Sequence, residues 1–198
     1  HIALGDNGGR AMTRDFYQLF ETAAGIAAIG WNGVGVTGFR LPAPTASETK
    51  RAIMWRLPGA VRAAPPAEVR AIIDAAIGYF AGQRVGFDDV PVDPAVQDPL
   101  FVEIYRKVRS LGWGETTTYG AIAQALGQGP EYARDVGQAM ARNPVPLIVP
   151  CHRVTAAGGR IGGFSAPGGS LSKARMLELE GATPAPLSSA PAQRGFDF

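Results

Sequence analysis

The chain contains one cysteine, Cys151, which stands in the run VPCHRV between a proline and a histidine. A lone cysteine can be a buried apolar filler, a metal ligand or a nucleophile. A free thiol has a pKa near ~8.5, so a nearby base or positive charge is needed to raise its thiolate fraction at neutral pH. His152 can supply the base and Arg153 the charge, and both are costly to bury without partners. The neighbours of Cys151 therefore favour a nucleophile over a filler.

The metal-ligand interpretation has little support. A structural zinc ion takes about four ligands, usually cysteines and histidines in paired spacings. The chain has one cysteine and two histidines, and His1 lies at its start. We therefore expect no metal.

A histidine base usually needs a third group that fixes its tautomer. Glu178 and Glu180, near the end of the last predicted helix, are the candidate carboxylates. Adjacent side chains diverge on a regular helix or strand, so His152 must act on Cys151 through an irregular backbone or a bridging water.

Composition limits the class of protein. The 198 residues suffice for one or two small domains, and 46% are hydrophobic and 18% charged, as in ordinary globular chains. No apolar stretch is long enough for a transmembrane helix, no signal peptide is visible, and one cysteine cannot form an internal disulfide. We expect a cytoplasmic protein that does not bind membranes.

Basic residues concentrate around the cysteine. Residues 133–175 hold one acidic residue, Asp135, and six basic residues: Arg134, Arg142, Arg153, Arg160, Lys173 and Arg175. The formal net charge of this stretch is therefore 6 − 1 = +5. A phosphate-bearing partner fits this stretch, and so does an ordinary solvated face.

The first part of the chain predicts a small α/β lobe. Residues 24–40 form a β-hairpin pattern around Asn32-Gly33, a pair typical of a type I′ turn. A capping-box pattern at Thr45 predicts a helix that runs to Arg56, and apolar spacing predicts another helix over residues 69–80. The proline- and acid-rich residues 82–99 are typical of a linker.

The second part predicts a mainly helical lobe. Asp98-Pro99 is a good helix start, and Leu100, Ile104, Val108 and Leu111 are spaced to line one face of that helix. Further helices are predicted over residues 119–126, 130–142 and 170–180. Gly127-Gln128-Gly129 joins the first two in the outline of a helix-turn-helix.

The active-site run and the segments beside it have their own patterns. Asn143-Pro144 should end the second helix of the pair, residues 145–150 should form a stiff extended segment, and residues 158–169 are glycine-rich and predict a loop. The predicted fold class is α+β, an α/β lobe with a small antiparallel sheet followed by a helical lobe with a helix-turn-helix. The predicted boundaries are a disordered leader (1–13), the first domain (14–95), the DNA-binding and active-site domain (96–182) and a disordered tail (183–198).

Four motifs together resemble one family. NPVPLIVPCHRV (143–154) closely resembles the active-site signature of the O6-alkylguanine-DNA alkyltransferases, also called methylated-DNA–protein-cysteine methyltransferases. GETTTYGAIAQALG (114–127) and ARDVGQAM (133–140) resemble the family's helix-turn-helix, and GGFSAPGGSLSKARMLELEG (162–181) resembles its glycine loop and closing helix. The likeness runs from about Asp98 to Gly181, whereas the first lobe resembles the family only in layout.

The resemblance implies irreversible transfer of an alkyl group from O6 of guanine, and as a further candidate from O4 of thymine, to Cys151, once per molecule. His152 would take the thiol proton through a water, and Glu180, which aligns better than Glu178, would orient it. Tyr119 would protonate the departing guanine, and Asn143 would brace the loop of Cys151.

The resemblance also implies a monomer that binds double-stranded DNA carrying O6-alkylguanine and flips the damaged base out. Arg134 would fill the vacated stack from a helix in the minor groove. The other implied contacts with DNA or the flipped guanine are Tyr119, Ala133, Gly137, Arg153, Val154, Phe164 and Ser165, together with the carbonyl of Cys151.

Some features depart from the family, and other functions stay open. Ala166-Pro167 looks like an insertion in the glycine loop, and Phe164 stands where a tyrosine is frequent. The runner-up function is a protein that binds alkylated bases and flags damage without transfer, although such proteins lack the cysteine. A helix-turn-helix regulator and a cysteine hydrolase are further alternatives.

Overall fold

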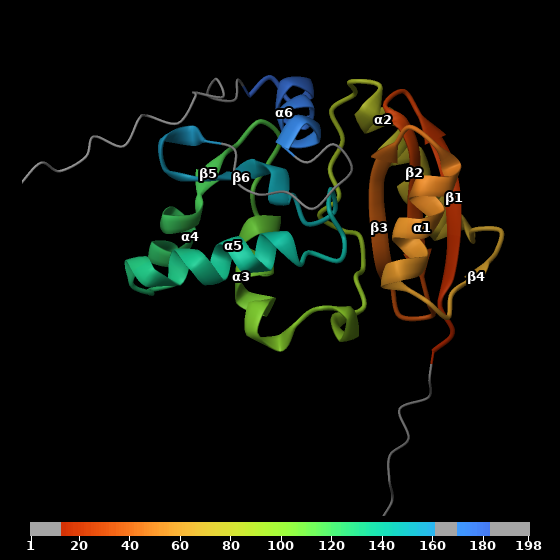
Figure 1. Cartoon of the computed structure of the whole chain (residues 1–198), viewed down its shortest axis with the longest axis horizontal. Coiled ribbons are helices and arrows are strands. Elements are labelled where there is room, and N and C mark those ends of the chain that lie inside the picture. Colours follow the sequence, from red (N-terminus) through yellow and green to blue (C-terminus); the bar gives the residue numbers. More distant parts are fainter. Residues whose placement is uncertain (1–12, 161–169, 183–198) are drawn as a thin grey trace, which may run out of the picture.

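The computed structural model describes residues 13–160 and 170–182, which form two lobes (Figure 1). The first lobe, residues 13–81, holds a small sheet and two helices, and the second, residues 99–160 and 170–182, is mainly helical. The connecting segment, residues 82–98, runs between them. The predicted leader, tail and most of the glycine loop lie outside the described residues.

The first lobe is built around a four-stranded sheet in the order β3-β2-β1-β4. Its strands are β1 (Phe16–Thr22), β2 (Gly25–Trp31), β3 (Val36–Ala43) and β4 (Val61–Arg62). Neighbours are antiparallel except β1 and β4, which are parallel. The sequence pattern does not predict β1, in which only Tyr17 is buried, so alternation between a buried and an exposed face is weak.

The predicted hairpin is confirmed as β2 and β3, but the predicted type I′ turn is wrong. That turn needs positive φ at both central residues, and neither Asn32 nor Gly33 has it. Instead the side chain of Asn32 closes a longer turn: its Oδ1 accepts hydrogen bonds from the backbone nitrogens of Val34 (2.8 Å) and Gly35 (3.1 Å). Asparagine side chains commonly mimic a backbone turn in this way.

Two helices cover opposite faces of this sheet. α1 (Ala46–Arg56) begins as predicted at Thr45, whose hydroxyl accepts a hydrogen bond of 3.2 Å from the nitrogen of Glu48. It packs on Tyr17 and Ala28 through Ile53 and Leu57. α2 (Ala67–Phe80) buries the predicted apolar face except Ile77, which is 37% exposed, and its contacts run from the sheet into the second lobe.

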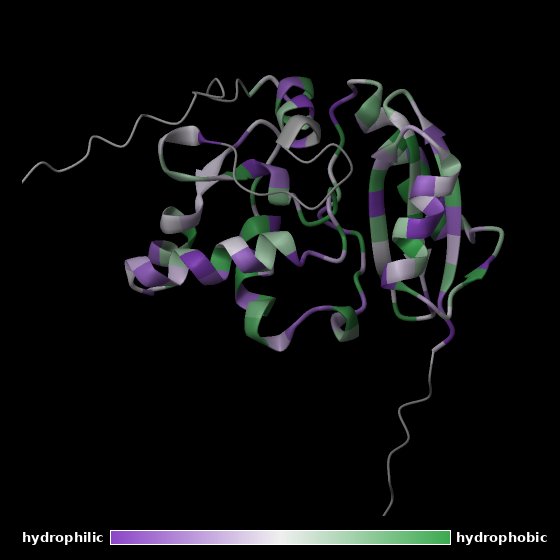
Figure 2. Cartoon of the chain, in the orientation of Figure 1, coloured by the Kyte–Doolittle hydropathy of each residue, from purple (hydrophilic) through white to green (hydrophobic). Residues whose placement is uncertain are grey.

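The second lobe is mainly helical. Its helices are α3 (Val102–Arg109), α4 (Tyr119–Ala125), α5 (Ala133–Ala141) and α6 (Ser170–Leu179). The 3₁₀ turns of the connecting segment and this lobe are η1 (Pro94–Val96), η2 (Pro99–Phe101), η3 (Pro130–Tyr132), η4 (Cys151–Arg153) and η5 (Ala157–Gly159). The short strands β5 (Thr117–Thr118) and β6 (Val154–Thr155) pair in parallel. Figure 2 shows the mixed hydrophilic and hydrophobic surface of α5, as expected for an amphipathic helix.

The start of the second lobe follows the prediction except at one residue. Asp98 caps η2 by accepting a hydrogen bond of 2.9 Å from the nitrogen of Leu100, and Ile104 and Val108 are buried. Leu100 is 78% exposed, so its predicted place on the buried face is wrong. The chain passes through a 3₁₀ turn before α3, and that tighter winding rotates Leu100 off the face that α3 buries.

Residues 145–150 form a compact turn, and the predicted extended segment is wrong. The nitrogen of Val149 donates to the carbonyl of Val145 at 2.9 Å, and Leu147 has φ +73°. Asn143 holds both ends: its Oδ1 accepts from Val145 N at 3.0 Å, and its Nδ2 donates to Val149 O at 2.8 Å. Proline fixes φ at its own position and leaves ψ of the segment free to turn.

The lobes meet along β3, the edge strand that faces the second lobe in Figure 1. The nitrogen of Phe39 donates to the carbonyl of Pro144 at 3.1 Å, just before the turn that leads to Cys151. Within the described parts of the chain, no helix has the length and apolar character needed to cross a membrane.

Candidate active site

Cys151 begins η4, directly after the compact turn. Its side chain is buried, with 2% of the residue exposed, and its backbone nitrogen donates to the carbonyl of Val149 at 2.7 Å. The turn held by Asn143 therefore fixes the backbone that carries the thiol.

His152 and Glu180 form a buried pair beside the thiol. His152 Nε2 is hydrogen-bonded to Glu180 Oε2, and both side chains are inaccessible to solvent. The carboxylate accepts, so Nε2 carries the proton and Nδ1 keeps its lone pair. Nδ1 is buried and has no hydrogen-bond partner among the described residues. His152 is thus oriented as a base that accepts a proton at Nδ1.

Glu180 binds four donors. Tyr79 Oη donates to Oε2 at 2.6 Å, while Arg153 Nε (2.7 Å) and the backbone nitrogen of Gly114 (3.1 Å) donate to Oε1. Burial alone would raise the pKa of Glu180, but the hydrogen bonds from His152, Tyr79 and Arg153 outweigh it and lower the pKa to about 2. The group is a carboxylate at neutral pH.

The charge of Glu180 is balanced by Arg153 rather than by His152. Burial lowers the pKa of His152, against the opposing effect of Glu180, so the imidazole is neutral before reaction. A neutral imidazole hydrogen-bonded to a carboxylate is the form that can accept a proton.

The thiol itself lies in a mixed environment. Burial raises the pKa of Cys151, while a hydrogen bond from Asn143 and the charge of Lys173 act in the opposite direction. Lys173 is 1% exposed, its Nζ donates to the carbonyl of Val154, and burial lowers its pKa to about 8. The resting group is therefore a protonated thiol with an ammonium ion and an amide placed to stabilise its anion.

Tyr119 lies close to Lys173. It begins α4, is partly buried, and its ring centroid is 5.8 Å from Lys173 Nζ. Burial and then the negative charge of a Cys151 thiolate raise the pKa of Tyr119, so the phenol keeps its proton. The structure thus brings Cys151, His152, Glu180, Tyr119 and Asn143 into one region.

The predicted DNA contacts divide into two groups. Arg134 is exposed on α5, and Ala133 and Gly137 are partly exposed one helical turn apart. A Cβ built on Gly137 would meet nothing within 4 Å, so the backbone there is open to close approach by another molecule. Val154 is fully buried and its carbonyl already binds Lys173. Phe164 and Ser165 lie outside the described residues.

Arg153 does not lie on a surface that DNA could reach. It is 8% exposed, and its guanidinium binds Glu180 and the carbonyl of Leu111 at 2.7 Å each. Lys173 is buried as well. Residues 133–175, with a net charge of +5, therefore form less of a basic surface than their composition predicts, because two of the six basic side chains are buried.

Three contributors to the site were missed from the sequence: Tyr79, Gly114 and Lys173. Tyr79 looks like one more apolar residue of α2, and Lys173 like one more surface charge. Gly114 has φ +74°, a conformation that favours glycine, and its place in the motif before Tyr119 was the one available signal.

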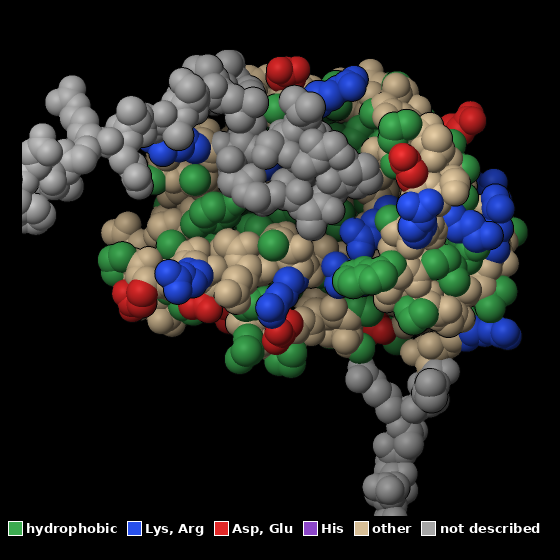
Figure 3. Space-filling view, in the orientation of Figure 1, with side chains coloured by type: hydrophobic (Ala, Val, Ile, Leu, Met, Phe, Trp, Pro, Cys, Tyr) green, Lys and Arg blue, Asp and Glu red, His purple; other side chains and the backbone are tan. Residues whose placement is uncertain are grey.

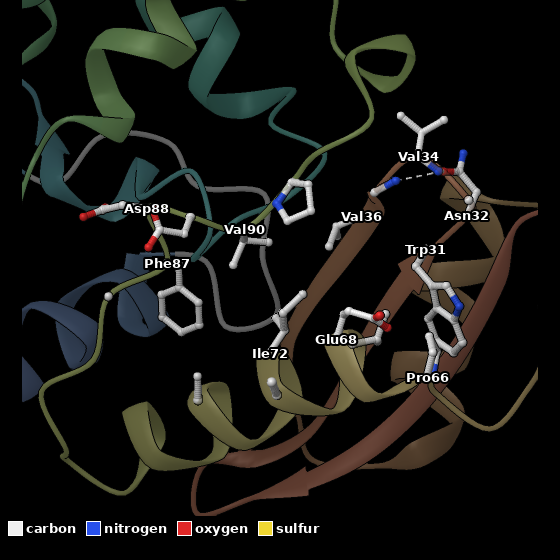
Figure 4. A pocket seen from close by; sticks show the side chains of 18 residues that line it. Trp31, Asn32, Val34, Val36, Pro66, Glu68, Ile72, Phe87, Asp88 and Val90 are labelled. Carbon is white, nitrogen blue, oxygen red and sulfur yellow. Dashed lines mark hydrogen bonds between the residues drawn. The ribbon is translucent and has the colours of Figure 1, made fainter.

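A cavity of about 790 Å³ in the first lobe lies apart from these residues (Figure 4). Ile72 and Glu68 face it from α2, Trp31 and Val34 from the hairpin, and Phe87 from the connecting segment. None of the candidate residues lines it.

Comparison with known proteins gives a consistent result. Residues 99–182 match the family described as 6-O-methylguanine DNA methyltransferase, DNA binding domain. A methylated-DNA–protein-cysteine methyltransferase of Mycobacterium tuberculosis is 34% identical over 164 residues, which cover 83% of this chain and 91% of that protein. One of Metallosphaera sedula is 44% identical over 103 residues, 52% of this chain, and the match spans 62% of that protein's length.

Two further relatives bear on DNA. A protein of Thermus thermophilus named DNA base-flipping protein is 41% identical over 109 residues, covering 55% of this chain and 71% of that protein. The crystal structure of Mycobacterium tuberculosis OGT in complex with DNA has a TM-score of 0.66 and 30% identity, covering 86% of this chain and 96% of that chain.

Proposed function

Because the chain belongs to the methylated-DNA–protein-cysteine methyltransferases, we propose that it repairs DNA by moving an alkyl group from O6 of guanine to its own Cys151. The observation that carries this proposal is the buried thiol beside a neutral His152 whose Nε2 is bound to the carboxylate of Glu180. In the same lobe, Ala133, Arg134 and Gly137 of α5 are at least partly exposed and can contact DNA.

The first step is proton transfer. The Cys151 thiol gives its proton, through a bridging water, to His152 Nδ1, which has no hydrogen-bond partner in the described part of the chain. Glu180 stabilises the imidazolium, so the thiolate anion and the imidazolium cation form together. Asn143 and Lys173 stabilise the thiolate, which burial alone disfavours.

The second step is an in-line displacement. Cys151 Sγ forms a bond to the alkyl carbon as the bond from that carbon to O6 breaks. The guanine anion is a poor leaving group unless it is protonated as it departs, and Tyr119 supplies that proton. The resulting phenolate lies beside the ammonium group of Lys173, which stabilises it.

The products are neutral guanine in DNA and S-alkylcysteine. A thioether is not readily reversed, so each molecule reacts once. The reaction calls for no cofactor, because thiol, base and acid all come from this chain.

DNA binding completes the proposal. A buried thiol cannot reach an atom inside a duplex, so the damaged nucleotide must be flipped out, at a cost of a few kcal/mol that is smallest for a badly paired base. Arg134 fills the vacated stack, while Ala133 and Gly137 allow the backbone of α5 to approach the minor groove. The carbonyls of Cys151 and Val154 read the guanine edge, each through its second lone pair, because the first is already bound.

A second candidate function is lesion binding without alkyl transfer. The observation that favours it is the similarity to the Thermus thermophilus protein named DNA base-flipping protein. The thiol and its proton relay favour transfer, because a binding protein has no use for them. A monomeric state and a cytoplasmic location are further predictions that follow from the family.

The deciding experiment is intact mass before and after incubation with a duplex carrying O6-methylguanine, followed by peptide mapping. We expect a gain of one methyl in place of one hydrogen, limited to one per protein and located on Cys151. Tight lesion binding with no gain in mass would instead identify a damage-flagging protein.

A further inference from the structure

A cleft of about 490 Å³ opens where the two lobes meet, and Cys151 is not among the residues that line it. We call it the arginine cleft. It is lined by Arg40 from β3, Ala52, Trp55 and Arg56 from α1, Val96 and Asp98 from the connecting segment, Tyr105 from α3, and Ala141 and Arg142 from the end of α5. Three arginines thus face one carboxylate.

Arg40 is the most unusual member. It is 9% exposed, its Nε is buried without a hydrogen-bond partner, and it forms no ion pair with any described residue. Burial, and then the charge of Arg56, lowers the pKa of Arg40 to about 10. A buried cation next to a second cation destabilises the free protein unless an anion joins them.

The other charged groups do not supply that anion. Asp98 forms no ion pair with any described residue, and its Oδ1 accepts the hydrogen bond that caps η2. Arg56 Nη2 donates to the carbonyls of Arg142 (3.5 Å) and Asn143 (3.4 Å), and its Nε is also buried without a partner. Arg142 is exposed at the mouth of the cleft. The lining therefore carries an excess of positive charge with unused donors.

The arginine cleft continues the surface that α5 presents. In Figure 1 the C-terminal end of α5 points towards α1 and β3, and Figure 3 shows Lys and Arg side chains gathered on this face where the lobes meet. From Arg134 to Arg142 the helix rises roughly 12 Å. At about 3.4 Å per base pair, that distance corresponds to roughly three to four base pairs of duplex.

We propose that the arginine cleft binds a backbone phosphate of the same DNA duplex, a few base pairs from the flipped nucleotide. Guanidinium groups suit phosphate because their donors form a planar fork. The first lobe would then take part directly in DNA binding. This inference rests on the proposed function in one respect, namely that α5 is the element that lies on DNA.

The first test compares Arg40→Gln and Arg142→Gln with the control Arg70→Gln, an exposed arginine on α2, across the sheet from α1. Duplex affinity is measured over a range of salt concentrations. We expect the two cleft variants to bind about tenfold more weakly at low salt, with a log–log salt slope smaller by about 0.9, as for one lost phosphate contact. Arg142 is exposed, so its variant remains informative if Arg40→Gln disturbs folding.

The second test locates the phosphate. Single phosphates on each side of the lesion are replaced by neutral methylphosphonates. We expect one position, a few base pairs from the lesion, at which the replacement weakens binding of the unmodified protein but not of Arg40→Gln. Equal affinity and salt slope in Arg40→Gln, Arg142→Gln and Arg70→Gln, or the absence of any such position, would overturn the proposal.

A third measurement separates a DNA site from a small-anion site. Inorganic phosphate, compared with chloride at equal ionic strength, should raise the melting temperature of the unmodified protein more than that of Arg40→Gln. If phosphate does so while the methylphosphonate series shows no coupled position, the cleft holds only free anions and the DNA proposal fails. Loss of alkyl transfer in all proteins, with free O6-benzylguanine as well as DNA, would count against the proposed function and not against the cleft, because the affinity comparison needs no transfer.

Discussion

Tyr79 of the first lobe donates a hydrogen bond of 2.6 Å to Glu180, which lies 101 positions later at the end of α6. Tyr79 is fully buried, and its pKa is raised by burial and by the carboxylate, so it remains a donor. The set of donors around Glu180 in the second lobe therefore includes a side chain from the first lobe.

Replacing Tyr79 with Phe tests this relationship. The loss of one hydrogen bond to the carboxylate should cost about 1 kcal/mol, which is roughly a fivefold lower rate of alkyl transfer. Glu180 then becomes more basic and stabilises imidazolium more strongly, so the pKa of His152 rises. We expect the acid limb of the pH–rate profile to move to higher pH.

The matched control is Tyr17→Phe, a buried tyrosine of the same lobe that packs under α1. It should leave the pH–rate profile in place. If Tyr79→Phe lowers the rate equally at every pH, its role is packing and not the positioning of charge.

Glu180→Gln should strongly destabilise the protein, because it leaves Arg153 buried without its carboxylate. Breaking a buried pair costs about 3–5 kcal/mol. The pKa of Glu180 is depressed from 4.5 to about 2, so its contribution is fully present above pH 4.5 and is lost as the pH falls towards 2. Urea unfolding at a series of pH values gives the free energy of unfolding. Its decrease as the pH falls from 4.5 towards 2 should be smaller in Glu180→Gln than in the unmodified protein.

Glu178→Gln is the control for that experiment, since Glu178 is exposed on the same helix. We expect stability and alkyl transfer close to those of the unmodified protein. A large loss of transfer in Glu178→Gln with full transfer in Glu180→Gln would reverse the assignment of the orienting carboxylate.

Cys151→Ala and Cys151→Ser should abolish transfer and keep affinity for duplexes with O6-methylguanine, because the proposed mechanism makes the thiolate the nucleophile and assigns most of the DNA contact to α5. Transfer is followed by intact mass and affinity by fluorescence anisotropy. Full transfer by either variant would refute the assignment of the nucleophile.

Arg134→Ala should slow repair of duplex DNA by at least about tenfold, because filling the vacated stack offsets the few kcal/mol that base flipping costs. Reaction with the free base O6-benzylguanine needs no flipping and should slow much less. Arg106→Ala, an exposed arginine on α3, provides the comparison. Equal slowing of both substrates in Arg134→Ala would argue against a role in the stack.

The sequence by itself determined the elements and groups that depend on near neighbours. The caps at Thr45 and Asp98, the amphipathic faces of α2 and α5, and the stop at Asn143 are set by residues a few positions apart, so their patterns are visible along the chain. The same holds for Cys151 and His152, whose adjacency indicates a nucleophile and its base. Glu180 was one of two candidates until the family likeness favoured it, and the structure places it against His152.

Only the tertiary structure decided which distant groups surround that pair. Tyr79, Gly114 and Lys173 reach the site through packing between elements far apart in the chain. The local sequence of Tyr79 and Lys173 does not distinguish them from core or surface residues, and Gly114 is marked only by its place in the motif before Tyr119. The inward turn of Arg153 and the meeting of Arg40, Arg56 and Arg142 in one cleft have the same origin. The residue type determines whether a side chain can carry a charge, but the fold determines how that side chain is solvated and which groups it contacts.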